Sequence, residues 1–211
     1  MANGISSEEL VIAMGKAHLL GSYGAAGQVP ERVFEAIEKI QAALPEQAYA
    51  FNLIHSPNEE ALEAKAVDLF IKHGVHIVEA SAFLALTEHI VYYRVAGLSQ
   101  NSDGSIHIKN KVIAKISRTE VAAPFMQAPP ENFVQALLKK GKITPLQADL
   151  AKLIPMADDI TVEGDSGGHT DNRPLVSLLP IIIKQRNDMQ AKTQFAQKIR
   201  VGAAGGISTP A

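Results

Sequence analysis

The sequence predicts an α/β fold, and within that class an incomplete (β/α)8 TIM barrel, from three observations. Stretches of strand and helix character alternate along the chain, which implies parallel strands joined by crossover helices. Polar residues or glycines follow nearly every predicted strand, where barrel enzymes build their sites. A glycine pair, Gly205-Gly206, follows a late strand, whereas a doubly wound fold carries its glycines after the first strand. Residues 21–24 match that fingerprint poorly, so we favour the barrel.

The first helix and the first full strand are predicted from residues near the amino terminus. Ser6 is predicted to cap a helix, with Glu9 three residues later, and the helix runs to about Ala17. Any strand before this helix is reduced to a stub. The apolar run at residues 19–23 then predicts the first full strand.

Five more strands and the helices between them continue the alternation. The other strands are predicted at residues 49–54, 75–80, 112–116, 159–163 and 199–203, and the helices at residues 30–44, 58–73, 87–95 and 174–192. Pro30 opens the first of these helices, Gly74 ends the second, and Asp103-Gly104 marks a polar turn over residues 99–105.

A helical excursion at about residues 118–157 interrupts the simple alternation. Two helices are predicted there, at residues 130–140 and 145–153, because each has a proline near its first turn and Gly141 separates them. Together the elements form one domain over residues 1–211.

The barrel is expected to be incomplete at both ends. The count is six full strands and a stub, so the first strand is truncated and the eighth is missing. Pro210 suits the first turn of a further helix, yet the sequence ends at Ala211. We therefore expect an internal piece of a longer protein, with low stability and doubtful activity when isolated.

Composition excludes several classes of function. The 211 residues are 46% hydrophobic and 20% charged, which suffices for a globular core, and the net charge of −2 gives no electrostatic reason to bind nucleic acid. The absence of cysteine is compatible with the cytoplasm and leaves chemistry to other side chains or a cofactor. No signal peptide and no apolar run of about 20 residues is present, so we expect a cytoplasmic protein without a membrane span.

Two glycine-rich segments carry the strongest functional signal. Residues 163–169 read EGDSGGH and residues 201–210 read VGAAGGISTP, and each reads as a strand running into paired glycines and then a helix. Glycines let backbone N–H groups approach an anion, and a helix N-terminus favours negative charge, so this pattern fits a phosphate-bearing cofactor. Taken alone, Gly205-Gly206 could be a simple packing turn between a helix and a strand. The βα context argues against a serine protease, although GDSGG occurs in all-β proteases.

The same two segments resemble the 2-nitropropane dioxygenase (nitronate monooxygenase) superfamily of FMN-dependent barrels. Within it, the sequence is most similar to the PfaD-type enoyl-reductase subunits of polyunsaturated-fatty-acid synthases and their polyketide-synthase relatives. Residues 1–27 resemble the first βα turn of these enzymes, and residues 137–180 resemble the synthase subunit more than a generic nitronate oxidase. The similarity spans essentially the whole chain.

The resemblance implies an FMN-dependent reduction of enoyl groups carried on an acyl carrier protein, with NAD(P)H as hydride donor and other synthase subunits as partners. It also assigns residues. His169 matches the catalytic histidine, which polarises the substrate or handles the α-carbon proton. The cofactor-binding positions it implies are Asn3, Gly4, Asn52, Lys115, Glu163, Gly167, Gly168, Gly205 and Gly206. The family's second phosphate-contacting loop would lie beyond Ala211.

Two alternatives remain open at this point. A nitronate monooxygenase would share the barrel, FMN and histidine but would use oxygen and no nicotinamide. The chain could also be an inactive fragment of either enzyme. No metal site is expected, because Glu88 and His89 are adjacent on a helix and lack a third ligand at suitable spacing.

Overall fold

A curled sheet of parallel strands forms the centre of the molecule. The computed structural model describes residues 2–57, 60–164, 171–193 and 195–205. In their order across the sheet, the strands are β1 (Gly21–Tyr23), β2 (Tyr49–Ile54), β3 (Ile77–Ser81), β6 (Lys111–Ile116), β7 (Asp159–Glu163) and β8 (Arg200–Ala204). Every neighbouring pair is parallel. The carboxyl ends of all these strands therefore lie along one rim, which is the rim where barrel enzymes place their sites.

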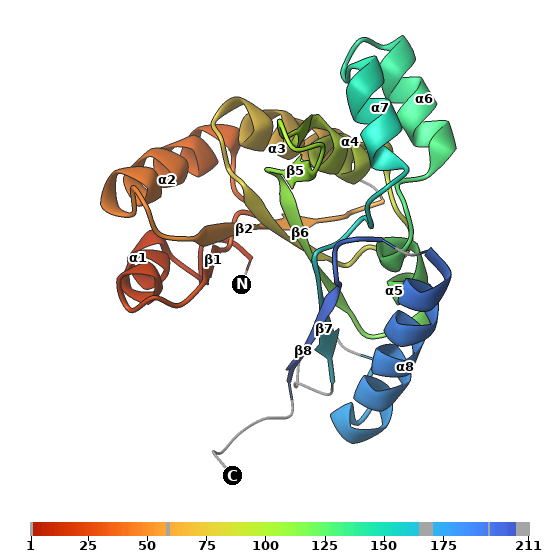
Figure 1. The fold of residues 1–211 in the computed structure, drawn as a ribbon. Coiled ribbons are helices and arrows are strands. Elements are labelled where there is room, and N and C mark those ends of the chain that lie inside the picture. Colours follow the sequence, from red (N-terminus) through yellow and green to blue (C-terminus); the bar gives the residue numbers. More distant parts are fainter. Residues whose placement is uncertain (1, 58–59, 165–170, 194, 206–211) are drawn as a thin grey trace.

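The strand order confirms the barrel class. The strands of this sheet follow one another in space as they do in sequence, with no reversal of order, whereas a doubly wound sheet reverses at its switch point. The sheet curls as an open part of a barrel, with helices around its outer side (Figure 1). All six predicted full strands are present within a few residues of their expected bounds.

The described residues before α1, where at most a stub of a strand was expected, form a turn and no strand. The backbone N–H groups of Asn3 and Gly4 donate to the carbonyls of Ala26 and Gly24, at 2.7 and 2.9 Å, and Gly24 N–H donates to Ser6 O at 3.0 Å. Through these hydrogen bonds, residues 3–6 lie alongside the segment that follows β1. The start of the chain is thus held against the loop after β1 by a turn, in which Asn3 and Gly4 have φ values of +56° and +71°.

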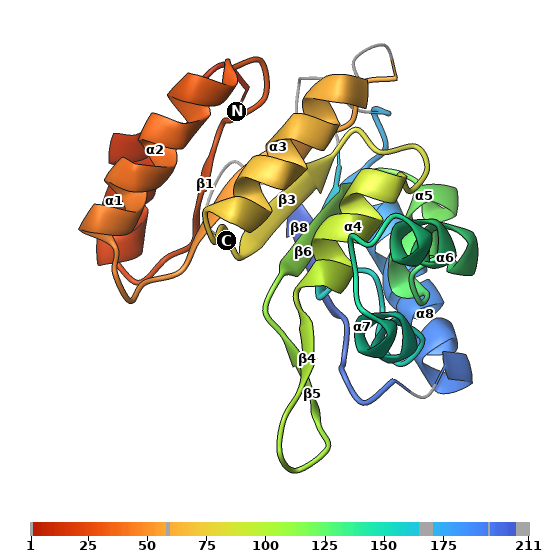
Figure 2. The same ribbon diagram turned by 90° about the horizontal axis from the view of Figure 1, so that it is seen from above.

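Helices surround the convex side of the sheet, and two of them pack mainly on a neighbouring helix rather than on the sheet (Figures 1 and 2). The helices are α1 (Glu8–Lys16), α2 (Pro30–Ala43), α3 (Glu60–Lys72), α4 (Glu88–Ala96), α5 (Thr119–Met126), α6 (Glu131–Lys139), α7 (Pro145–Ala151) and α8 (Leu175–Thr193). Strand residues that face them are buried and apolar: Phe51, Leu53, Val78, Ala80, Val112, Ala114, Ile160 and Val162. Because strand side chains alternate between faces, the residues between these positions face the concave side.

One predicted cap is wrong by a single residue. The N-cap of α1 is Ser7, whose side chain accepts from Leu10 N–H, and not Ser6. Ser6 instead donates its hydroxyl to Ser22 O in β1, at 2.5 Å. Both serines precede the glutamates of the first turn, so the sequence pattern alone did not distinguish them.

Three elements were not predicted. Strands β4 (Leu98–Gln100) and β5 (Ile106–Ile108) pair antiparallel around the predicted polar turn, and the hairpin extends away from the body of the molecule (Figure 2). Helix α5 forms directly after β6 although it contains Pro124. Three-residue strands are too short to show periodicity, and a proline argues against a helix, so none of the three elements has a clear sequence signal.

A buried ion pair joins the base of the sheet to α4. Arg94 is fully buried, and its guanidinium donates to Asp158 Oδ2 at 2.6 Å and to the carbonyl of Pro155 at 2.9 Å. The same carboxylate oxygen accepts from Val112 N–H at 2.8 Å. These bonds hold α4 against the starts of β6 and β7. No helix within the described residues is long and apolar enough to cross a lipid bilayer.

Candidate active site

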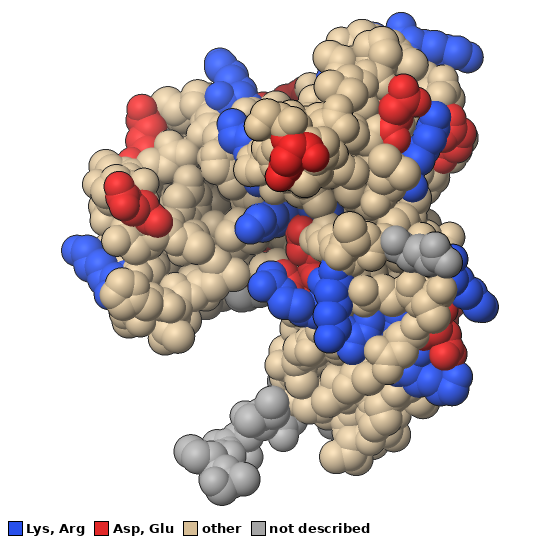
Figure 3. All heavy atoms as spheres, viewed as in Figure 1, with Lys and Arg blue, Asp and Glu red and all other residues tan. Residues whose placement is uncertain are grey.

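The concave face of the sheet carries polar and charged side chains where a simple core would be apolar. Asn52 of β2 pairs in register with Glu79 of β3, and Lys115 of β6 pairs with Thr161 of β7, two residues before Glu163. Acidic and basic atoms are visible in the hollow on this side of the molecule (Figure 3). The fold thus brings Asn52, Lys115 and Glu163, which come from distant parts of the sequence, onto one surface.

Charges on this surface are paired and partly shielded from water. Lys115 Nζ lies 3.2 Å from Glu163 Oε1, with the two side chains only 23% and 19% exposed. Burial raises the pKa of Glu79, and the nearby Glu163 raises it further, while Ser22 and Lys115 oppose the shift. A carboxyl group with a raised pKa is a candidate proton carrier in a site of this kind. Sequence analysis had not assigned Glu79 a role, although an acidic residue within an otherwise apolar strand was a usable signal.

Asn52 has one hydrogen-bonding atom without a partner. Its amide nitrogen donates to Glu79 O at 3.2 Å and to Ser81 Oγ at 3.0 Å, whereas the buried Oδ1 has no partner. Leaving a buried acceptor unpaired costs free energy, so such atoms are uncommon and often mark the place of a bound group. Asn52 therefore fits its predicted position in a ligand site.

Asn3 and Gly4 support the loop that follows β1. Besides their backbone bonds to that loop, the Asn3 side chain packs so closely on Gly27 that a Cβ at Gly27 would lie 2.0 Å from Asn3 Oδ1. Gly27 also has a φ of +79°, a conformation that glycine adopts without strain. The described contacts of Asn3 and Gly4 are therefore with this loop, beside the same rim as Asn52.

The remaining predicted residues lie after β7 and β8. Gly205 directly follows β8 and has a φ of +78°, which suits a tight turn at the carboxyl end of a strand. Gly167, Gly168, His169 and Gly206 lie outside the described residues. Their assignments stay predictions.

The chain resumes after the first of these stretches at Asp171, which is held next to β6. Its carboxylate accepts from Arg118 at 2.6 Å and from Ser117 at 2.5 Å, and these hydrogen bonds hold its pKa well below the usual range. Ser117 and Arg118 directly follow β6. Asp171, two residues after the predicted catalytic His169 in the sequence, is thus held at the rim of the sheet.

A buried carboxylate ties together the loops after β2 and β3. Glu63 of α3 is fully buried; its Oε2 lies 2.7 Å from His55 Nδ1, and its Oε1 accepts from the Thr87 hydroxyl. His55 follows β2 directly and stacks on Phe83 with ring centroids 5.3 Å apart. Sequence analysis missed this cluster, because its members are far apart in the chain and match no motif.

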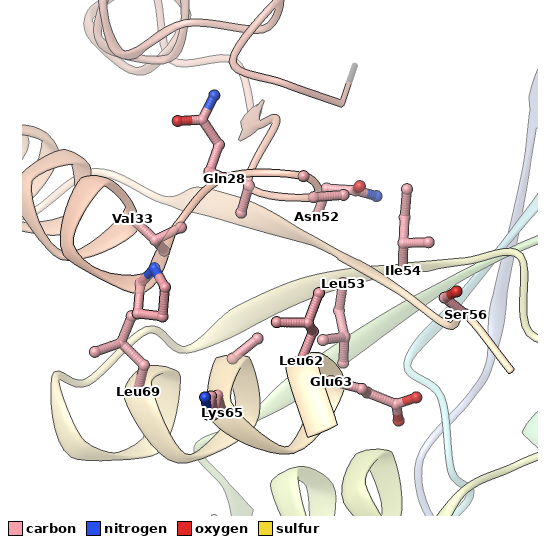
Figure 4. A pocket seen from close by; sticks show the side chains of 15 residues that line it. Gln28, Val33, Asn52, Leu53, Ile54, Ser56, Leu62, Glu63, Lys65 and Leu69 are labelled. Carbon is pink, nitrogen blue, oxygen red and sulfur yellow. The ribbon is translucent and has the colours of Figure 1, made fainter. Parts of the chain in front are cut away.

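Two pockets flank the sheet. The first, of about 100 Å³, lies between α2, α3 and the end of β2, and Asn52 is among the residues that line it (Figure 4). The second, of about 770 Å³, lies between the β4–β5 hairpin and residues such as Lys111, Asp158 and Arg200. These residues belong to the amino-terminal ends of their strands or precede them. The larger pocket is therefore at the opposite end of the sheet from the predicted site.

Fold and site together define a barrel-type domain with a polar concave face, and comparison with known proteins is consistent with this class. No protein-family model matches the chain. Over its whole length the chain is 55% and 53% identical to polyunsaturated fatty acid synthase subunits B and C of Thraustochytrium sp., and 47% identical to polyketide biosynthesis protein PksE of Bacillus subtilis. It spans only 10%, 14% and 28% of the lengths of these three proteins.

Solved structures agree with these relatives. The chain matches the enoyl reductase domain of MlnA from the macrolactin biosynthesis cluster of Bacillus amyloliquefaciens with a TM-score of 0.93 and 38% identity, over 100% of this chain and 48% of that chain. FabK from Thermotoga maritima, at 16% identity and a TM-score of 0.51 over 95% of this chain and 56% of that chain, supports the fold alone. The chain is thus similar over its whole length to parts of polyunsaturated-fatty-acid synthase and polyketide biosynthesis proteins and to a polyketide-cluster enoyl reductase domain, which confirms the resemblance.

Proposed function

We propose that this chain is part of an FMN-dependent enoyl reductase that uses NAD(P)H and acts in the cytoplasm on enoyl thioesters bound to an acyl carrier protein. Its work would serve polyunsaturated-fatty-acid or polyketide biosynthesis, together with other subunits of the synthase. The observation that carries the proposal is the match to the MlnA enoyl reductase domain over the whole chain, at 38% identity.

The described residues fit a flavin at the carboxyl ends of the strands. The unpaired Oδ1 of Asn52 would accept a hydrogen bond from the ring N–H of the cofactor. Lys115 would contribute positive charge near the ring, partly balanced by Glu163. When bound, the reduced flavin supplies a hydride to the β-carbon of the enoyl group.

The chain's own residues would orient the reactants and handle the proton. By its place in the EGDSGGH motif, His169 would polarise the substrate or manage the proton at the α-carbon, a role suited to an imidazole that titrates near neutral pH. We expect His169→Ala to lower enoyl reduction by about 10²-fold or more while FMN stays bound. Loss of the flavin from this variant would instead assign His169 a structural role.

The first test is an FMN titration of the purified protein, followed by flavin fluorescence. We expect saturable binding, and about threefold to tenfold weaker binding for Asn52→Ala, because one hydrogen bond is lost. Asn132→Ala, which removes an exposed asparagine of α6 with no described bond, is the matched control. An unchanged affinity for Asn52→Ala would remove that residue from the cofactor site.

The reaction itself is tested with two substrate pairs. The flavin-loaded full-length protein is assayed with an enoyl pantetheine thioester plus NADPH, and separately with an alkyl nitronate plus oxygen. We expect turnover of the thioester. Turnover of the nitronate alone would replace this proposal with a nitronate monooxygenase.

A further inference from the structure

The pocket between α2 and α3 has a mostly apolar lining, in which Gln28, Asn52, Ser56, Glu63 and Lys65 are the polar members. Its walls come from the loop after β1, the first turn of α2, the end of β2 and one face of α3. The apolar residues that line it are Ala25, Ala26, Pro30, Val33, Leu53, Ile54, Leu62, Ala66 and Leu69. An apolar lining favours a ligand segment without charges or hydrogen-bonding groups.

Among the described residues that line the pocket, Glu63 has the only carboxylate, and it is turned away from the pocket. Glu63 lines the pocket, but both of its oxygens are engaged, one with His55 and one with Thr87. In Figure 4 its carboxylate points away from Val33 and Leu69. The His55–Glu63–Thr87 cluster thus keeps a negative charge out of the apolar space.

Residues predicted for the cofactor site form or support the inner wall of this pocket. Asn52 lines it while the Asn52 amide reaches across to β3. Ala26 and Gln28, also in the wall, lie against residues 3 and 4: Asn3 N–H donates to Ala26 O, and a Cβ at Gly4 would lie 2.9 Å from Gln28 Nε2. Asn52 and the loop after β1 therefore border both this pocket and the predicted flavin site, at the same rim.

Size decides what the pocket can hold. Sites for whole small molecules have about 300–1,000 Å³, so a pocket of about 100 Å³ cannot hold a flavin or a nicotinamide. An apolar cavity of about 150 Å³ binds benzene, which has six carbons, so this pocket takes about four carbons of a chain. Leu62, which lines the pocket, is 48% exposed, so this end of the pocket lies at the surface.

We propose that this pocket binds the unbranched hydrocarbon chain of the acyl thioester. The inference rests on the proposed function and adds that the site selects substrates by the length of the apolar chain beyond the thioester. Each methylene that enters the pocket raises affinity by about fourfold, until about four carbons are buried. Carbons beyond these extend past Leu62 into solvent and add little.

The test measures binding as a function of chain length. Dissociation constants of saturated acyl pantetheine thioesters of increasing length, which are product analogues, are measured by calorimetry with the flavin-loaded full-length protein. We expect affinity to rise over about four added carbons and then to level off. Equal affinity for all lengths in the unmodified protein would overturn the proposal.

Two variants test whether the dependence of affinity on chain length arises in this pocket. Ala66→Leu fills the space from α3 and should weaken binding of the longer thioesters at least tenfold while leaving the shortest unchanged. Its control, Ala61→Leu, places the same side chain on an exposed position of α3 outside the pocket. Leu62→Glu, at a half-exposed position where folding is not at risk, should discriminate against long chains in the same way, with Ala61→Glu as control.

The outcomes separate this proposal from the proposed function. If Ala66→Leu and Leu62→Glu weaken binding of the thioesters equally at all chain lengths, the pocket assignment is overturned, whereas the proposal of enoyl reduction is not affected. Length-dependent binding, lost in both variants, would support the pocket even if the protein reduced no enoyl thioester with NADPH. That last result would refute the proposed reaction alone.

Discussion

Glu79 shows at the residue scale how the concave face differs from an ordinary barrel interior. It lies in the middle of β3, with the apolar neighbours Val78 and Ala80 buried on the opposite face. A carboxyl group held in this position is costly to ionise, and burial accordingly raises its pKa. Such a residue lowers stability at neutral pH, which is typical of a position retained for function.

We expect Glu79→Gln to raise the free energy of unfolding near pH 7. The pKa of Glu79 in the folded protein lies above its unfolded value, so the favourable contribution of the protonated group is complete below the unfolded pKa and is lost as pH rises through the folded pKa. Glutamine does not ionise, so the free energy of unfolding gained by Glu79→Gln should vanish below about pH 4, where Glu79 is protonated in both the folded and the unfolded state. Urea unfolding at both pH values measures the difference.

The exposed Glu38 of α2 provides the control for this experiment. Glu38→Gln should change the free energy of unfolding by less than about 0.5 kcal/mol at either pH, as surface substitutions usually do. A Glu79→Gln protein that is less stable than the unmodified protein near pH 7 would contradict the argument, and would mean that the ionised carboxylate has a stabilising partner.

At the scale of elements, helix α7 stabilises the unpredicted hairpin. Gln147 completes the capping box of α7 with Thr144, and its amide nitrogen also donates to Ala96 O at 2.9 Å and to Leu98 O at 3.4 Å. The prolines and Gly141 predicted the helices of this region from local signals. The contact between α7 and the base of the hairpin joins residues about 50 positions apart, so no local sequence pattern could predict it.

We expect Gln147→Ala to lower the free energy of unfolding by about 1–2 kcal/mol, because half of the capping box and the bonds to the hairpin are lost. Gln147→Glu keeps an acceptor for Thr144 N–H but has no donor for the two carbonyls. Hydrogen exchange should therefore speed up over residues 98–108 in both variants, and over α7 only in Gln147→Ala. Equal protection of the hairpin in all three proteins would show that Gln147 does not hold it.

At the scale of the whole molecule, the unpaired edge of the sheet is the feature expected to cause self-association of the 211 residues on their own. Within the described sheet, β8 has a neighbouring strand on one side only, and Arg200, Gly202 and Ala203 are exposed. An unpaired strand edge is a template for pairing with another chain. On the other side, residues 3–6 already cover part of the segment after β1.

We expect the isolated 211-residue chain to associate in a concentration-dependent manner through β8. Ala203→Lys adds a charge to this edge strand and should weaken association about tenfold, whereas Ala61→Lys on α3 should not. Light scattering coupled to gel filtration measures the mass at several concentrations. A monomer at every concentration, with a cooperative melt well above room temperature without FMN, would contradict this prediction.

The sequence alone predicted the class of fold, the six full strands and most helices, because periodicity, prolines and glycines act within a few residues of one another. The family resemblance also assigned Asn52, Lys115 and Glu163 to cofactor-binding positions. Tertiary structure decided what no local pattern contains: that these three share one surface with Glu79, that Asn52 keeps an unpaired oxygen, and that Glu63 is withdrawn from an apolar pocket. Each of these depends on contacts between distant segments, which form only when the sheet curls and the helices pack against it.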